Sequence, residues 1–233
     1  MILQDVLDLI VAGPVGDLPL GGGGSGVLPA EKRPLLGLKL DSALLALHTR
    51  FPLRLKTLEL VTFTGRYSYP LEPKYALTDP GAEPQRFLLD SESEPFTGDV
   101  LAIERIYDGD HCPLPLNDRE DPLSWFTPRP TTLSMDYPLD DTHYFVEYRA
   151  RHPKLDTSSP SSEAVDVPDV LLNALLARVA YEAFCGQTGE NATMKAQEQL
   201  AKYEAECALV EDRNSVQSSV TDTNTKFDQG GWV

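Results

Sequence analysis

The spacing of hydrophobic residues changes twice along this chain of 233 residues. Near the N-terminus, and again between residues 166 and 213, apolar side chains recur every three or four positions, as on one face of an α-helix. Between these regions, Leu58 and Leu60 alternate with polar residues, which is typical of a β-strand. This order predicts an α+β fold: an antiparallel α-helical bundle with an inserted small antiparallel β region and an extended C-terminal arm.

Two helices joined by a glycine-rich segment are predicted near the N-terminus. The first covers residues 1–12, where apolar residues fall on one face. Residues 13–37 are dominated by glycine and proline, a composition that predicts a mobile loop. The second helix is expected over residues 40–48, with Asp41 or Ser42 as its N-terminal cap.

The middle of the chain predicts a small β region. A hairpin is expected over residues 57–69, because an alternating run is interrupted by Gly65 and then followed by more aromatic residues. Three further strands are expected at residues 100–107, 131–135 and 143–148, which are rich in β-branched and aromatic side chains.

Two long helices are predicted after this region. The first covers residues 167–185 with Asp166 as its cap, and the second covers residues 191–213. Their apolar stripes predict antiparallel packing on each other and contacts with other helices or neighbouring subunits. The residues expected in subunit or bundle packing are Val170, Ala174, Tyr181, Phe184, Leu200 and Tyr203.

Residues 215–233 are rich in Ser, Thr, Asn and Gln, so they do not bury enough apolar surface to fold alone. Because apolar anchors lie at the far end of this segment, we expect Phe227, Trp232 and Val233 to dock on a partner. A frayed terminus is the simpler alternative. The predicted domains are the N-terminal helices with the glycine-rich loop at 1–56, the β-rich insertion at 57–155, the C-terminal helical hairpin at 156–214 and the docking arm at 215–233.

The charge and the cysteines exclude several classes of protein. The chain has 36 acidic residues against 20 basic ones, a net charge of −16, whereas nucleic-acid affinity depends on Lys and Arg at the phosphates. Its three cysteines have no paired spacing, which favours a reducing cytoplasm. No signal peptide and no apolar run of membrane-spanning length is recognisable, so no membrane partner is expected.

No motif for catalysis is present, neither a phosphate-binding loop nor a nucleophile elbow nor a zinc-protease helix. The nearest cluster of metal-binding residue types is Asp108, Asp110, His111 and Cys112. An Asp-Gly-Asp turn between strands explains the same residues without a metal. We therefore expect no enzyme, no catalytic residue, no cofactor and no metal.

Three stretches carry a resemblance to a known family: IERIY at residues 103–107 with LPLND at 114–118, YRARHP at 148–153, and VPDVLLNALLA at 167–177. In the order of its segments, the chain resembles the head-to-tail adaptor proteins of short-tailed double-stranded DNA phages, also called connector or head-completion proteins. The resemblance extends over about residues 40–213. It is most similar to the adaptors of podoviruses that carry a large virion RNA polymerase.

The resemblance implies a structural virion protein that is made in the host cytoplasm and located at the head-to-tail junction. It implies a homo-oligomeric ring, a dodecamer, whose partners are the portal protein above and the tail tube or tail proteins below. Double-stranded DNA would pass through this ring without specific binding. An acidic ring agrees with this expectation, because like charges oppose close approach of phosphates.

Two alternatives remain at this stage. The first is a ligand-binding or receptor-binding module in the β region, which predicts a concave aromatic site from residues such as Tyr67, Tyr69, Trp125, Phe126 and Tyr137. The second is a metal-dependent hydrolase that uses the turn at residues 108–112.

Overall fold

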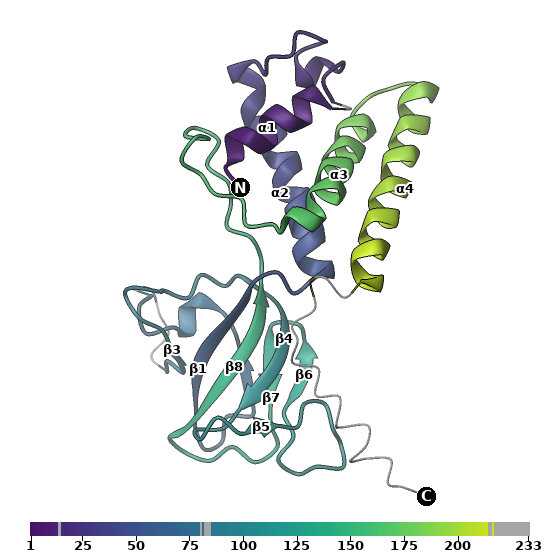
Figure 1. Ribbon diagram of the computed structural model, residues 1–233. Coiled ribbons are helices and arrows are strands. Elements are labelled where there is room, and N and C mark those ends of the chain that lie inside the picture. Colours follow the sequence, from purple (N-terminus) through teal and green to yellow (C-terminus); the bar gives the residue numbers. More distant parts are fainter. Residues whose placement is uncertain (14, 80, 82–84, 214–215, 217–233) are drawn as a thin grey trace, which may run out of the picture. The chain divides into compact units, whose positions relative to one another are not determined.

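The structure is a computed structural model that describes residues 1–13, 15–79, 81, 85–213 and 216 (Figure 1). The chain divides into two compact units, Met1–Asp166 and Val167–Val233. The elements are α1 (Leu3–Ala12), η1 (Pro19–Gly21), η2 (Ala30–Lys32), α2 (Arg33–Arg50), β1 (Leu55–Thr62), β2 (Ser68–Pro70), η3 (Pro73–Tyr75), β3 (Leu88–Leu89), β4 (Val100–Tyr107), β5 (Pro113–Leu114), β6 (Phe126–Arg129), β7 (Thr132–Ser134), β8 (Thr142–Ala150), η4 (Asp169–Leu171), α3 (Leu172–Cys185) and α4 (Glu190–Asp212).

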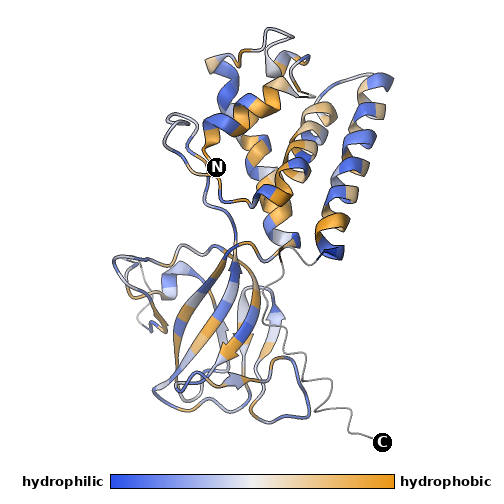
Figure 2. Ribbon diagram, in the orientation of Figure 1, coloured by the Kyte–Doolittle hydropathy of each residue, from blue (hydrophilic) through white to orange (hydrophobic). Residues whose placement is uncertain are grey.

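The larger sheet of the first unit has β8 in its middle. Its order is β3-β1-β8-β4-β5, and every neighbouring pair is antiparallel. β8 pairs with β1 along the whole of β1, and with β4 through two register shifts. Tyr144, Val146, Tyr148 and Ala150 of β8 are buried, whereas the residues between them are less buried, so one face of the strand is covered. Figure 2 shows hydrophilic and hydrophobic residues interspersed along β1 and β8.

The smaller sheet, in the order β2-β7-β6, shares one hydrophobic core with the larger sheet. Trp125 is fully buried in this core, with its ring 5.0 Å from that of Tyr144 and 5.8 Å from that of Tyr69. Tyr69 in turn meets Phe87 edge to face at 5.3 Å. Such tilted and edge-on aromatic pairs are favourable beyond the area they bury. This aromatic cluster joins the two sheets.

The hairpin predicted over residues 57–69 is wrong. β1 pairs with β8 and β3 in the larger sheet, whereas β2 pairs with β7 in the smaller one. Gly65 has φ +83° and turns the chain from one sheet to the other. The long pairing of β1 with β8 stabilises the fold more than the short local pairing of a hairpin would. The strands expected at residues 100–107, 131–135 and 143–148 correspond to β4, β7 and β8.

The glycine-rich segment is more ordered than its composition predicts. It contains η1 and η2, and Val15, Leu20 and Leu28 are buried. The backbone N–H groups of Gly23 and Gly24 donate to the carbonyl oxygens of Leu18 and Gly16 at 2.9 and 2.8 Å. The four positive φ values within residues 22–26 belong to glycines, which adopt that conformation at little cost.

Helix α2 begins at Arg33, seven residues before the predicted start, and neither Asp41 nor Ser42 caps it. Pro34 fits the first turn, where its missing N–H has no helical partner to lose. Gly37 lets the helix pack closely on Thr157, because a Cβ there would come within 2.3 Å of the Thr157 methyl group unless that side chain moved. Asp41 instead accepts the backbone N–H of residue 155 at 3.2 Å.

The first turn of α1 is capped by a distant part of the chain. The backbone N–H groups of Leu3 and Gln4 donate to the carbonyl oxygens of Glu163 and Pro160 at 2.8 and 3.0 Å. No side-chain cap is present at Ile2. These carbonyl groups satisfy donors that the start of every helix leaves unpaired.

A joint connects the C-terminal end of α2 to the end of β8. His48 Nδ1 lies 3.3 Å from the carbonyl oxygen of Ala150, and Arg149 donates to the carbonyl oxygen of Thr49 at 2.6 Å. The other arm of the Arg149 guanidinium contacts Glu104 of β4 at 2.6 Å. The helix is therefore attached to β8, and the Arg149 side chain links this joint to the adjacent strand β4.

In the second unit, α3 and α4 pack along each other. α3 begins later than predicted, at Leu172, after the short η4 helix, so Asp166 is not its cap. The backbone N–H of Asp166 instead donates to His152 Nε2 at 3.1 Å. α4 differs by one residue at each end from the predicted range of 191–213. The structure is thus α+β, while the single bundle with an inserted β region and its domain boundaries stay predictions.

Within the part of the chain that the structure describes, none of the helices combines the length and the apolarity that a transmembrane segment requires.

The joint predicts a loss of stability in acid. His48 is fully buried, and burial, assisted by the nearby His152, lowers its pKa; the Ala150 carbonyl and Asp166 act in the opposite direction but weigh less. A folded-state pKa below the usual value of about 6.5 means that the unfolded chain binds the extra proton, so stability is lost as pH falls below about 6.5. When the pH is lowered from about 7.5 to about 5.5, we expect the free energy of unfolding to fall less in His48→Gln than in the native chain.

Urea unfolding at the two pH values measures this difference. His111→Gln, which changes an exposed histidine of a strand connection, is the matched control and should keep the native pH dependence. An equal loss of stability in the native chain and in His48→Gln would show that another group titrates.

Candidate functional site

The helix pair of the second unit contains the residues that the sequence predicts for packing. Ala174, Phe184 and Tyr203 are buried. The other three, Val170, Tyr181 and Leu200, are partly exposed. Figure 2 shows that α4 is mostly hydrophilic, so much of its surface is suited to solvent or to polar partners. The role of these six residues in subunit contacts stays a prediction.

Arg178 connects the two helices at their centre. Its guanidinium lies 5.0 Å from the ring centre of Tyr181 and 5.5 Å from that of Tyr203 on α4. It also contacts Glu182, one turn further along α3, at 3.4 Å. Cation–π contacts of this kind stabilise a packed pair without a fully apolar seam.

A groove of about 220 Å³ lies between the start of α3 and the end of α4. The exposed side chains of Val170 and Leu209 give it an apolar part, and Arg213 lies at its edge. Its lining residues are Asp169, Val170, Asn173, Glu206, Leu209, Val210 and Arg213. The predicted docking residues Phe227, Trp232 and Val233 follow in the chain and lie outside the described residues.

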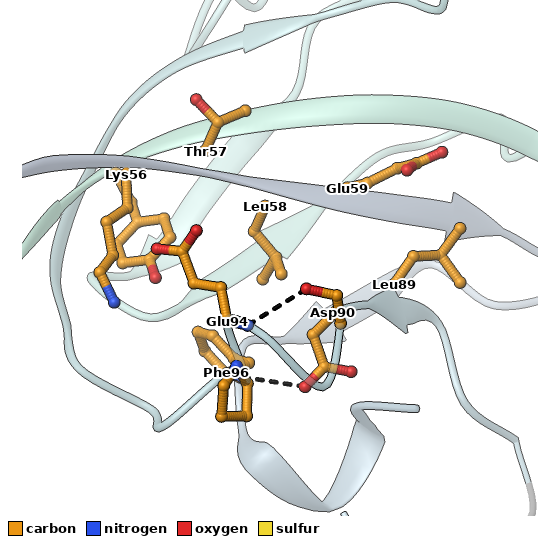
Figure 3. A pocket seen from close by; sticks show the side chains of 11 residues that line it. Lys56, Thr57, Leu58, Glu59, Leu89, Asp90, Glu94 and Phe96 are labelled. Carbon is orange, nitrogen blue, oxygen red and sulfur yellow. Dashed lines mark hydrogen bonds between the residues drawn. The ribbon is translucent and has the colours of Figure 1, made fainter. Parts of the chain in front are cut away.

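A polar pocket of about 290 Å³ lies beside β1 and the chain that leaves β3 (Figure 3). Its wall includes Lys56, Glu59, Asp90, Glu94 and Phe96. Charged groups in a hollow are the usual starting point for a binding or catalytic site, so their hydrogen-bond partners decide what the pocket is able to do.

Most of these groups are used within the fold. Lys56 Nζ lies 2.9 Å from the carboxylate of Asp99, and the Tyr148 hydroxyl donates to the same carboxylate at 3.1 Å. Burial first, and then the neighbouring Asp99, raise the pKa of Tyr148, which keeps this hydroxyl protonated as a donor. Glu59 pairs with His143 at 2.7 Å.

Asp90 also has a structural role. It accepts the hydroxyl and the backbone N–H of Thr78, and the backbone N–H of Phe96 at 2.9 Å, the last drawn in Figure 3. Burial raises the pKa of this carboxyl, but the three hydrogen bonds outweigh burial, and the pKa is lowered. Asp90 therefore remains an acceptor that fixes the loop, and is not poised to transfer protons near neutral pH.

The turn at residues 108–112 is explained by its backbone. One carboxylate oxygen of Asp108 accepts the N–H groups of Asp110 and Cys112 at 3.0 and 2.8 Å. The ring of His111 stacks on Phe145 at 4.4 Å. Among the described residues, no group of three or more His, Cys, Asp or Glu side chains is arranged to hold a metal ion.

The five aromatic residues considered for a ligand site do not come together in one hollow. Tyr69 and Trp125 are fully buried in the core, whereas Tyr67 and Tyr137 are largely exposed and Phe126 is half-buried. The two buried rings already have aromatic partners. The structure therefore favours their role in the core over a concave aromatic site.

One surface of the first unit lies outside all the sites that the sequence predicts. A groove of about 210 Å³ lies along α2, lined by Leu38, Asp41, Leu45, Arg151, His152 and Lys154. The spacing of the leucines is apparent in the sequence, but the basic residues Arg151 and Lys154 are more than 100 positions away in the chain. Only the joint between α2 and β8 brings the two sets together.

Most charged groups of the polar pocket are thus paired within the fold, and exposed grooves lie beside helices in both units. Residues 40–223 match the model of the SU10 adaptor protein family. The chain belongs to this family and is a phage adaptor protein. The predicted likeness to adaptors is thereby confirmed, whereas the podovirus type stays a prediction. No curated protein matches the chain.

Lys56→Met tests the pair behind the pocket. The side chains of Lys56 and Asp99 are only 16% and 10% exposed, so the change leaves a buried carboxylate with the Tyr148 hydroxyl as its remaining side-chain donor. Removing one partner of a buried pair costs about 3 kcal/mol, which urea unfolding would measure as a lower midpoint. The double variant Lys56→Met with Asp99→Asn should recover at least part of the loss, because no charge stays unpaired.

Lys74→Met is the matched control, since Lys74 pairs with Glu72 at 2.8 Å on the surface, where both side chains are about half exposed. We expect its unfolding midpoint to be unchanged. A Lys56→Met variant as stable as this control would show that the buried pair does not support the fold.

Proposed function

We propose that this adaptor forms a homo-oligomeric ring, a dodecamer, between the portal and the tail of a virion. In this role it extends the DNA exit channel and provides the surface to which the tail tube or tail proteins attach. The match to the SU10 adaptor family over residues 40–223 carries the proposal, because it spans most of α2, all the strands and both helices of the second unit. The function needs surfaces and no catalysis.

Electrostatics supports this role. The chain carries a net charge of −16, so a ring of its copies would present predominantly negative charge to the DNA within. Like charges raise the energy of close approach, and a channel of this kind lets the phosphate backbone pass without holding it. The same charge makes copies repel one another, which opposes assembly in the absence of a template.

Imaging with the portal protein of the same phage tests the ring. Alone and at low salt, the adaptor is expected to be mainly monomeric by light scattering, and with portal it should form a ring in negative-stain images. Raising the salt from about 50 mM to about 500 mM should favour assembly, because the Debye length then falls well below the distance between subunits. A stable ring without portal at low salt would contradict the template requirement, and no ring on portal would overturn the function.

Truncation after Asn214 tests the predicted docking arm. The change removes Phe227, Trp232 and Val233, whereas the buried residues of α4 from Ala196 to Val210 all precede the cut. We expect the thermal midpoint to stay unchanged and co-sedimentation with portal to weaken, since loss of a buried aromatic anchor costs roughly 2 kcal/mol or more, about thirtyfold in affinity.

Trp232→Ala should reproduce most of this loss, and Thr225→Ala, in the same segment, should not. Unchanged co-sedimentation of the truncated chain would reduce the arm to a frayed terminus. A lower thermal midpoint would instead show that the arm belongs to the folded core.

A further inference from the structure

Helix α1 presents a narrow acidic and apolar stripe. Asp5, Asp8, Leu9 and Ala12 are all exposed and recur every three or four residues, so they share one face of the helix. Ile2, immediately before the helix, extends this stripe and is 45% exposed, and Leu9 is 42% exposed. The α1 stripe runs along ten helical residues, about 15 Å.

Helix α2 presents an apolar stripe of similar length, and basic side chains from another segment lie beside it. Leu35, Leu38 and Leu45 are exposed at spacings of three and seven residues, with Leu38 at 67% and Leu45 at 46%. They span ten positions, again about 15 Å. Beside the last two lies the 210 Å³ groove, whose rim carries the exposed side chains of Arg151 and Lys154.

The two basic side chains at this rim are available for a partner. Among the described residues, no hydrogen bond or ion pair of the Arg151 or Lys154 side chain is found. Asp41, the one acid in the groove, already accepts the backbone N–H of residue 155. A basic and apolar groove is unusual on a chain of net charge −16, and it complements an acidic and apolar helix face.

We propose that the groove on α2 of one copy binds the α1 stripe of the neighbouring copy. Leu9 of the neighbour packs on Leu38 and Leu45, and its Asp5 and Asp8 face Arg151 and Lys154. The inference rests on the proposed ring function and names the contact that builds the ring. The two surfaces differ, and each carries like charges that would repel a second copy of itself. Used head to tail, such a contact is heterologous, and heterologous contacts build a ring when the rotation between copies closes.

The small size of this contact agrees with assembly on a template. One helix face against one groove is less than a stable free complex normally buries, so the contact is expected to form when the portal holds neighbouring copies side by side. The ionic part of the contact also sets how each subunit is oriented on the next, because the acidic stripe has to meet the basic rim. Salt screens the long-range repulsion between the net charges of the copies more than these short, partly buried pairs, so the contact is compatible with assembly at higher salt.

Charge reversal on both sides tests the proposal. The two single-sided variants are Arg151→Glu with Lys154→Glu, and Asp5→Lys with Asp8→Lys; the compensated variant carries all four changes. Each is mixed with portal of the same phage, and adaptor copies per portal are counted from co-sedimentation and negative-stain images. We expect roughly tenfold less adaptor on portal for each single-sided variant, because like charges then face each other at every contact, and complete rings for the compensated variant.

Arg119→Glu with Arg129→Glu reverses two exposed charges of the β region and is the matched control, which should form complete rings. Far-UV circular dichroism and the thermal midpoint establish that each variant is folded. Complete rings from a single-sided variant would overturn the contact, and so would failure of the compensated variant, the result expected if the groove binds portal instead. If the native chain also forms no ring on portal, the proposed function fails and this inference fails with it.

Discussion

The first unit depends on the pairing of β8 along both of its edges. β1 covers one edge over its full length, and β4 covers the other. Because alternate residues of β8 are buried, a shift of one residue would move Tyr144 and Val146 out of the core. This register also fixes where β8 ends, and the carbonyl oxygen of Ala150 and the side chain of Arg149 then hold the C-terminal end of α2.

The charged groups of the β region serve the fold before they serve any partner. Lys56, Asp99 and Tyr148 form one buried set, and Asp90 is occupied by Thr78 and Phe96. A pocket in which most ionisable groups are already paired is poorly suited to proton transfer. This arrangement agrees with membership in an adaptor family, whose work is done by contacts between proteins.

Two of the exposed surfaces suited to partners lie on the helices of the first unit. The α1 stripe is acidic, and the groove on α2 is basic at its rim although the chain as a whole is strongly acidic. Because one surface is acidic and the other basic, copies with the same net charge have one orientation in which they attract. The fold supports both surfaces by hydrogen bonds. The first N–H groups of α1 donate to the carbonyl oxygens of residues 163 and 160, and the Arg149 side chain at the end of β8 donates to the Thr49 carbonyl of α2.

The sequence by itself determined the elements that follow from local pattern: α1, α4, β4 and β8 lie within about two residues of their predicted ranges, because periodicity and propensity are local properties. It also carried the likeness to adaptor proteins. Only the tertiary structure decided the pairing of β1 with β8 in place of a hairpin, the close packing of Gly37 on Thr157, and the placement of Arg151 and Lys154 beside Leu38 and Leu45. These outcomes depend on residues roughly 80 to 120 positions apart, whose contacts exist only after the sheet has set its register.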